Sequence, residues 1–339
     1  MRRLCTATTR GRLPRPATHP SEVLQWPATV LAQSQREAYF ADGCLTLPSF
    51  VGAGWVRRLA AAARALVEES RAMAPPAPGG PPDAMSWSRG RRGHFLLEEG
   101  HTPEAPRVTR VAAPVDVEPD VFWEFCLSEG GPADVARELL GPDVRYHHSK
   151  LNFKLAGAGG RTRVHWHQDI QFWPHTNYSP LTVGVYLEDT DEAMGPMHVL
   201  PLSVHDELHA LEDAEGNWTG VLGEEALRRI GPPLGERARS MVGPAGTVTV
   251  HNARCVHGGP PNTSERHRPL LLYTFAAATA HPLPGGTNPL HAQSSRGCPM
   301  VRECPSRLAV FDPQARPCPM APSFAAGYRP PFFAQQDDG

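Results

Sequence analysis

Short apolar runs separated by turn residues dominate the chain after Val144, and they constrain its fold more than any other feature. Such a series is typical of a β-sandwich or barrel and argues against a parallel sheet with crossover helices. The 37 prolines and 31 glycines favour many turns. A partly helical insertion over 208–230 interrupts the series. The predicted strands are Arg145–Leu155, Leu181–Glu188, Met197–Leu200, Thr247–His251 and Pro269–Phe275.

Helical patterns are confined mainly to the first 140 residues. The segment before Gly43 reads as the end of a helix, followed by a glycine turn and a strand. Residues Trp55–Ser70 place their apolar side chains on one stripe, which predicts an amphipathic helix. A second helical stretch is expected over Phe122–Leu140, ending at Gly141. The sequence therefore predicts a mainly β domain with flanking helices.

Composition divides the chain into three parts. Residues 1–34 form an arginine-rich extension that we expect to be disordered, 35–281 form the central domain, and 282–339 form an extension rich in proline and cysteine. The first twenty residues lack the apolar region of a secretory signal, so we expect a cytoplasmic location; the arginine-rich start leaves a mitochondrial or other organellar location as the alternative. Seven cysteines without a signal peptide indicate free thiols. The spacing of Cys298, Cys304 and Cys318 fits no tight zinc pattern.

The charge balance excludes several partner classes. With 33 basic and 35 acidic residues the net charge is -2, which argues against a general nucleic-acid binder. No apolar run is long enough to span a membrane. All the basic residues except Lys150 and Lys154 are arginines, which we attribute to a GC-rich coding bias. Arg89, Arg91 and Arg92 are expected in a solvated loop rather than in a lid over an anionic substrate. The expected partner is a small molecule, and the oligomeric state is not predicted.

The segment His165–Asp169 contains the first candidate for chemistry. If it is a strand, residues two apart point to the same face, so His167 and Asp169 can bind one metal ion. One imidazole and one carboxylate are two members of the 2-His-1-carboxylate triad of non-haem Fe(II) oxygenases. His165 shares that face and is the competing ligand.

A second histidine has to come from a distant strand. His257 follows a predicted strand and a turn, and two glycines come after it, which allows the backbone to approach a ligand closely. His251 is the competing choice, but it lies mid-strand and lacks those glycines. Arg268 stands at the start of the last predicted strand, where a buried guanidinium needs an anionic partner. A carboxylate cosubstrate would supply that partner through a bidentate contact.

These motifs together resemble the phytanoyl-CoA dioxygenase family, whose members are Fe(II)- and 2-oxoglutarate-dependent hydroxylases. The resemblance extends from Gln35 to Ala280. It implies a double-stranded β-helix, also called a jelly roll or cupin-like barrel, and it implies Fe(II), 2-oxoglutarate and O2 as cofactor and cosubstrates. The segments that carry it are Trp166–Pro174, Gly195–Pro201 and His257–Ser264.

The resemblance also assigns roles to single residues. It implies that His167, Asp169 and His257 bind the iron and that Arg268 binds the distal carboxylate of 2-oxoglutarate. Asn152 and Trp173 would lie beside the cosubstrate, as in the related ectoine hydroxylase. His148 falls where that relative has a substrate contact.

Three features differ from the family pattern or bear on variants of it. Gly259 replaces a hydroxyl residue that helps hold the cosubstrate in some members, and Pro201–His205 replaces the usual Pro-Gly-Ser-His. The retained Asp169 argues against a halogenase, because halogenases replace this carboxylate with a small residue.

The function expected on this basis is hydroxylation of an unactivated C–H bond in a small-molecule or lipid-like substrate, with release of succinate and CO2. The substrate itself is not predicted. Two alternatives stay open: a non-catalytic metal- or ligand-binding jelly roll, and a differently reacting metalloenzyme on a cupin-like barrel. Neither alternative requires an arginine eleven residues after the last ligand, so Arg268 distinguishes them from the dioxygenase.

Overall fold

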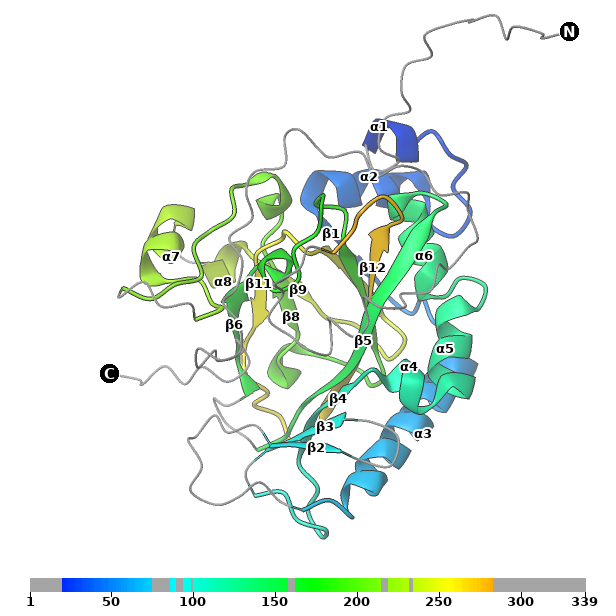
Figure 1. Ribbon diagram of the computed structural model, residues 1–339, viewed down its shortest axis with the longest axis vertical. Helices are drawn as coiled ribbons and strands as arrows, with labels where there is room; N and C mark the ends of the chain where they lie inside the picture. The colour runs from blue at the N-terminus through cyan, green and yellow to red at the C-terminus, as the bar shows by residue number, and fades with distance from the viewer. Residues whose placement is uncertain are drawn as a thin grey trace, which may run out of the picture.

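A computed structural model describes residues 20–74, 86–89, 94–98, 100–157, 162–214, 219–231 and 234–282. Two antiparallel sheets with flanking helices make up this part of the chain (Figure 1). The predicted fold class, mainly β with a jelly-roll core, is confirmed. Arg89 lies at the end of a strand, with its side chain outside the described part, and Arg91, Arg92 and the tail cysteines also lie outside it.

The larger sheet has eight strands in the order β1-β10-β7-β12-β5-β4-β3-β2. The long strands β5 and β12 pair along almost their whole length and form its centre. Three strands of this sheet, β2 to β4, were not predicted from the sequence. The strands are β1 (Cys44–Leu47), β2 (Ser86–Arg89), β3 (His94–Leu97), β4 (Val108–Ala112), β5 (Val144–Lys154), β7 (Leu181–Tyr186), β10 (Val248–Asn252) and β12 (Arg268–Ala277).

The smaller sheet has four strands in the order β6-β11-β8-β9. Its inner face meets that of the larger sheet, since the backbone N–H of Met197 in β8 donates to the Tyr186 hydroxyl in β7 at 3.1 Å. Tyr186, Leu270 and Leu272 form a small apolar cluster on that inner face. The strands are β6 (Val164–His167), β8 (Met197–Val199), β9 (Arg239–Met241) and β11 (His257–Gly259).

Helices cover the outer face of the larger sheet, where α3 to α6 lie together beside β5 in Figure 1. The main hydrophobic core fills the space between the larger sheet and these helices, and Leu151 and Tyr273 of the sheet are fully buried in it. Among the described residues, no helix combines the length and the apolar character that a membrane span requires. The helices are α1 (Pro20–Val23), α2 (Gln33–Asp42), α3 (Ala53–Ser70), α4 (Pro114–Val117), α5 (Pro119–Leu127), α6 (Pro132–Leu140), α7 (Glu224–Ile230) and α8 (Leu234–Arg237).

The helical stretch predicted over Phe122–Leu140 is two helices, α5 and α6. Gly130 adopts a left-handed conformation (φ 69°), and Pro132, which lacks an N–H, begins the second helix. The turn at Gly43 agrees with the prediction, since its φ of 78° closes α2 before β1. A side chain at Gly43 would also meet the Sγ atom of Cys255.

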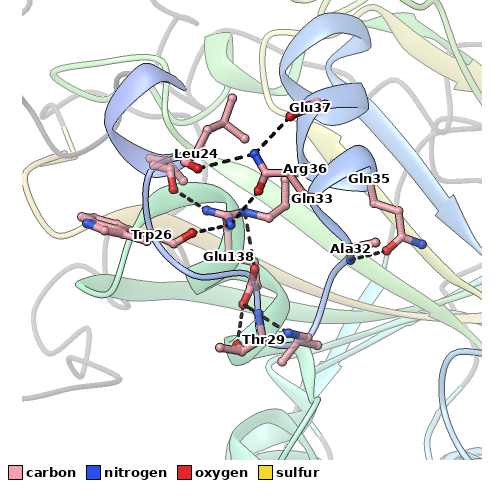
Figure 2. A network of polar contacts seen from close by, with 11 residues as sticks. Leu24, Trp26, Thr29, Ala32, Gln33, Gln35, Arg36, Glu37 and Glu138 are labelled. Carbon is pink, nitrogen blue, oxygen red and sulfur yellow. Dashed lines mark hydrogen bonds and ion pairs between the residues drawn. The ribbon is translucent and has the colours of Figure 1, made fainter.

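A buried arginine ties the start of the chain to the domain. Arg36 in α2 is 1% exposed; its Nη1 donates to the Trp26 carbonyl at 2.8 Å, and its Nε lies 3.4 Å from the Glu138 carboxylate of α6 (Figure 2). Val23 and Leu31 are buried too. These apolar side chains and the Arg36 contacts hold residues 20–34, which the composition placed in the N-terminal extension, against α6.

Candidate metal centre

Three of the predicted residues meet between the two sheets. His167 ends β6, His257 begins β11, and the two are direct partners across the antiparallel pair. Asp169 follows in a short 3-10 turn over Asp169–Gln171. Its carboxylate oxygens lie 3.6 Å from His167 Nε2 and 3.8 Å from His257 Nε2. Within the described ranges, these three residues form the one group whose ligand atoms all lie within 4.8 Å of one another.

Both histidines are oriented by backbone carbonyls. His167 Nδ1 contacts the carbonyl of His165 at 2.8 Å, and His257 Nδ1 contacts that of Cys255 at 3.0 Å. A proton held on Nδ1 leaves Nε2 with its lone pair directed at the shared space, as in most metal-binding histidines. Cys255 itself is a buried free thiol, and burial raises its pKa, which agrees with a packing role.

Charge states at the site suit a cation. Burial lowers the pKa of His257 well below its usual value, and the neighbouring His167 and His251 lower it further, so His257 is neutral. Burial would raise the pKa of Asp169, but the positive charge of Lys150, together with the contacts of His257 and the neighbouring histidines, outweighs it and holds that pKa well below its usual value. Neutral imidazoles and an ionised carboxylate are the forms that bind metal.

The competing histidines take different places. His165 contributes its backbone carbonyl and lies outside the three-residue group. His251, on β10 of the larger sheet, is 3% exposed in its side chain, and its Nε2 lies 3.7 Å from Asp169 Oδ2. Its ring is 4.4 Å from that of His257, centroid to centroid. His251 is therefore a close neighbour of the triad, which the sequence indicated only as an alternative ligand.

A second cluster of charge lies at the start of β12. Arg268 pairs in register with Lys154 of β5, and each is 4% exposed. Arg268 Nε and Nη1 have no hydrogen-bond partner among the described residues, whereas Lys154 Nζ donates to the carbonyl of Pro260. Burial, and after it the charge of Arg268, lowers the pKa of Lys154. Two buried basic side chains, one of them with unpartnered N–H donors, form a binding site suited to a carboxylate.

The presence of glycine at position 259, where some family members have a hydroxyl residue, has a steric explanation. A Cβ on Gly259 would lie 2.5 Å from the carbonyl oxygen of Pro196 and 3.1 Å from Lys154 Nζ. A serine or threonine hydroxyl therefore has no room there, and the lysine ammonium occupies the space beside it.

The two remaining residues predicted beside the cosubstrate lie on different segments, Asn152 on β5 and Trp173 after the Asp169 turn. Asn152 Oδ1 accepts a hydrogen bond from Arg110 Nε at 2.9 Å. Trp173 is buried and packs on His147 and His148, with ring centroids 5.4 and 5.7 Å apart. Phe172, rather than Trp173, packs edge-on against His167, with ring centroids 5.8 Å apart.

Like Lys154, Lys150 and Arg110 are charged residues of the larger sheet's inner face to which the sequence assigned no role. Lys150 lies two residues before Asn152 on β5, so both side chains point to the inner face. Its charge is the largest of those that lower the pKa of Asp169. One signal was available in the sequence, because the two lysines of the chain are four residues apart on one predicted strand.

The family model described as phytanoyl-CoA dioxygenase matches residues 39–270. Among characterised relatives, a probable alpha-ketoglutarate-dependent hypophosphite dioxygenase of Stutzerimonas stutzeri is 39% identical over 165 residues, which cover 46% of this chain and 53% of the relative. An L-proline trans-4-hydroxylase of Streptomyces griseoviridis is 29% identical over 169 residues, covering 44% and 62%. The chain thus spans about half the length of the relatives it matches.

Solved structures support the same assignment at the level of the fold. EctD from S. alaskensis with bound Fe superimposes with a TM-score of 0.57 and 22% identity, covering 79% of this chain and 83% of that one. The same protein with 2-oxoglutarate and 5-hydroxyectoine gives a TM-score of 0.56 and 23% identity, covering 81% and 88%. The family match covers more than half of the chain and contains the whole triad, so the protein belongs to the phytanoyl-CoA dioxygenase family of iron- and 2-oxoglutarate-dependent dioxygenases.

Proposed function

We propose that this protein is an Fe(II)- and 2-oxoglutarate-dependent dioxygenase that hydroxylates an unactivated C–H bond of a small-molecule or lipid-like substrate, with release of succinate and CO2. The observation that carries the proposal is the presence of two features in the space between the two sheets. One is a buried triad whose protonation states suit a metal ion. The other is a buried arginine with two open donors.

His167, Asp169 and His257 would hold the iron. The donor set fits the ion, because each imidazole has its other nitrogen on a backbone carbonyl and the carboxylate is ionised. Three protein ligands leave positions for a chelating keto acid and for O2. When bound, iron with 2-oxoglutarate and O2 supplies the oxidising power: one oxygen atom enters the substrate and the other enters succinate as the keto acid loses CO2.

Arg268 would bind the distal carboxylate of 2-oxoglutarate, with Lys154 as a second cation across the strand pair. Asn152 and Trp173 are proposed to line the remaining cosubstrate surface. The residues contribute orientation and an interior that excludes water, and no acid–base pair is required. A metal-binding protein without catalysis would not need the open guanidinium of Arg268.

We assign this chemistry to residues 35–281. In this proposal the segment over 20–34 anchors the domain through Arg36, and 282–339 form an extension.

Oxidation of a P–H bond is a second candidate reaction. The relative named for hypophosphite is 39% identical. The site also carries a cation, Lys150, which acts on Asp169. Insertion of oxygen into one P–H bond of hypophosphite gives phosphite, with the same conversion of 2-oxoglutarate and O2 into succinate and CO2.

Anaerobic titration of the purified apoprotein with Fe(II) and 2-oxoglutarate tests the proposal. A visible charge-transfer band that requires both components, and that is absent in His167→Ala, is the expected result. Iron binding without that band contradicts the proposal and favours the non-catalytic or differently reacting alternatives. Succinate release with hypophosphite, L-proline and ectoine then compares the candidate substrates.

A further inference from the structure

Lysine occurs at two positions in the whole chain, and both belong to one strand. Every other one of the 33 basic residues is an arginine. Lys150 and Lys154 are four residues apart on β5, so their side chains share the inner face. Arginine is the basic residue everywhere else in this chain, and lysine occurs where the inner face of the larger sheet lies opposite the metal centre. We infer that a compact ammonium group is favoured at positions 150 and 154.

Lys150 lies in the middle of the larger sheet. It pairs with Leu272 of β12 on one side and with Ala112 of β4 on the other. The next residue, Leu151, is fully buried on the opposite face against the helices. Lys150 is nevertheless partly exposed. Since it is central in its sheet and points away from the helices, its exposed atoms face the space between the two sheets.

The two lysines differ in their partners. Lys154 donates to a backbone carbonyl and stands across from Arg268. The side chain of Lys150 has neither a hydrogen bond nor an ion pair with any residue in the described part of the chain, although the charges of Asp169 and Arg110 both act on it. Burial lowers its pKa to about 8. A cation in this environment is stabilised when an anion meets it.

Asp169 is not the anion that pairs with Lys150 once iron and 2-oxoglutarate are bound. In the proposed function Asp169 is an iron ligand, and the distal carboxylate of 2-oxoglutarate is neutralised at Arg268. Positive charge remains at Lys150, with Arg110 as a second cation near it. An arginine at position 150 would carry a planar fork that binds carboxylates in a bidentate manner, and it would compete with iron for Asp169. The point charge of lysine avoids that competition.

We propose that Lys150 binds an anionic group of the primary substrate and selects compact oxyanions over neutral molecules. The inference rests on the proposed function and names the substrate class for the same site. The oxyanion chemistry is shared by inorganic phosphorus oxyanions and by organic carboxylates. Experiments with one probe of each kind distinguish these two sources.

The test compares wild type with Lys150→Met, and with Arg57→Met as a matched control that removes an exposed positive charge from α3. Sodium hypophosphite, sodium propionate and neutral propionamide are each added to the anaerobic protein with Fe(II) and 2-oxoglutarate. We expect one of the two anions, and not propionamide, to shift the charge-transfer band of wild type and of Arg57→Met. The concentration needed should rise about 10- to 100-fold in Lys150→Met, the loss of one hydrogen bond to a charged group.

A second measurement does not depend on a folded variant. Cyanate adds to free lysine amines, and mass spectrometry separates modification at Lys150 from that at Lys154. The anion that shifts the band should slow modification at Lys150, whereas propionamide should not. Absence of the band in wild type refutes the proposed function itself. A normal band that neither anion shifts, or a Lys150→Met protein that loses affinity for 2-oxoglutarate instead of the anion, overturns the assignment of Lys150.

Discussion

Replacing Arg268 with methionine should affect cosubstrate binding and apoprotein stability in opposite directions. The guanidinium is 4% exposed, and two of its nitrogens have no hydrogen-bond partner among the described residues. Its direct strand partner is another buried cation, Lys154. Burial lowers the pKa of Arg268, because the charged form is poorly solvated. Without an anion, the buried charge of Arg268 destabilises the apoprotein. With 2-oxoglutarate bound, the same guanidinium is the main contact to the distal carboxylate.

The magnitudes follow from those two states. Losing one partner of a buried, hydrogen-bonded charge pair costs about 2–5 kcal/mol. A loss of about 3 kcal/mol weakens 2-oxoglutarate binding roughly 150-fold. In the apoprotein, methionine keeps most of the apolar packing and removes an uncompensated charge, which is worth on the order of 1–3 kcal/mol of added stability. The melting temperature should rise by roughly 5 °C for a domain of this size.

Thermal unfolding of the apoprotein and anaerobic 2-oxoglutarate titration measure the two effects. Arg57→Met, which removes an exposed arginine, should change neither. An Arg268→Met protein that melts below wild type and binds 2-oxoglutarate with wild-type affinity would refute the reasoning. It would mean that the guanidinium has a structural partner rather than a cosubstrate.

The buried Arg36 shown in Figure 2 bridges α2 and Glu138 of α6, so Arg36→Met should lower the free energy of unfolding by about 3 kcal/mol; urea denaturation checks this, and an unchanged midpoint contradicts it. Burial lowers the pKa of His175 to about 4, below its ordinary 6.5. The unfolded state therefore binds an extra proton between these values, and stability should fall by up to about 3 kcal/mol as the pH falls from 6.5 to 4. Melting curves across that range should lose this slope in His175→Gln. His251→Phe should weaken Fe(II) binding about 10- to 100-fold, as expected for a residue that supports the ligand Asp169, whereas His257→Phe should abolish stoichiometric binding; equal losses would make His251 a ligand.

Local signals in the sequence account for much of the fold. The glycine turn at Gly43 and the strands β5 and β12 follow the predicted pattern, because turn propensity and apolar runs are properties of neighbouring residues. The break between α5 and α6 was missed although Gly130 and Pro132 mark it. Strands β2 to β4 were also missed, since strands of four or five residues carry little periodicity.

The sequence by itself identified the residues of the candidate centre. His167 and Asp169 are two residues apart, which keeps an imidazole and a carboxylate close together, although the strand ends at His167 and Asp169 lies in a 3-10 turn. Motif context selected His257 and Arg268 as their distant partners. The tertiary structure decided which other side chains lie near these residues. His251 lies beside the triad, and Lys150 and Lys154 lie on the inner face of the larger sheet, as Arg268 does. Contacts between strands far apart in the chain depend on sheet order and register, which no local pattern encodes.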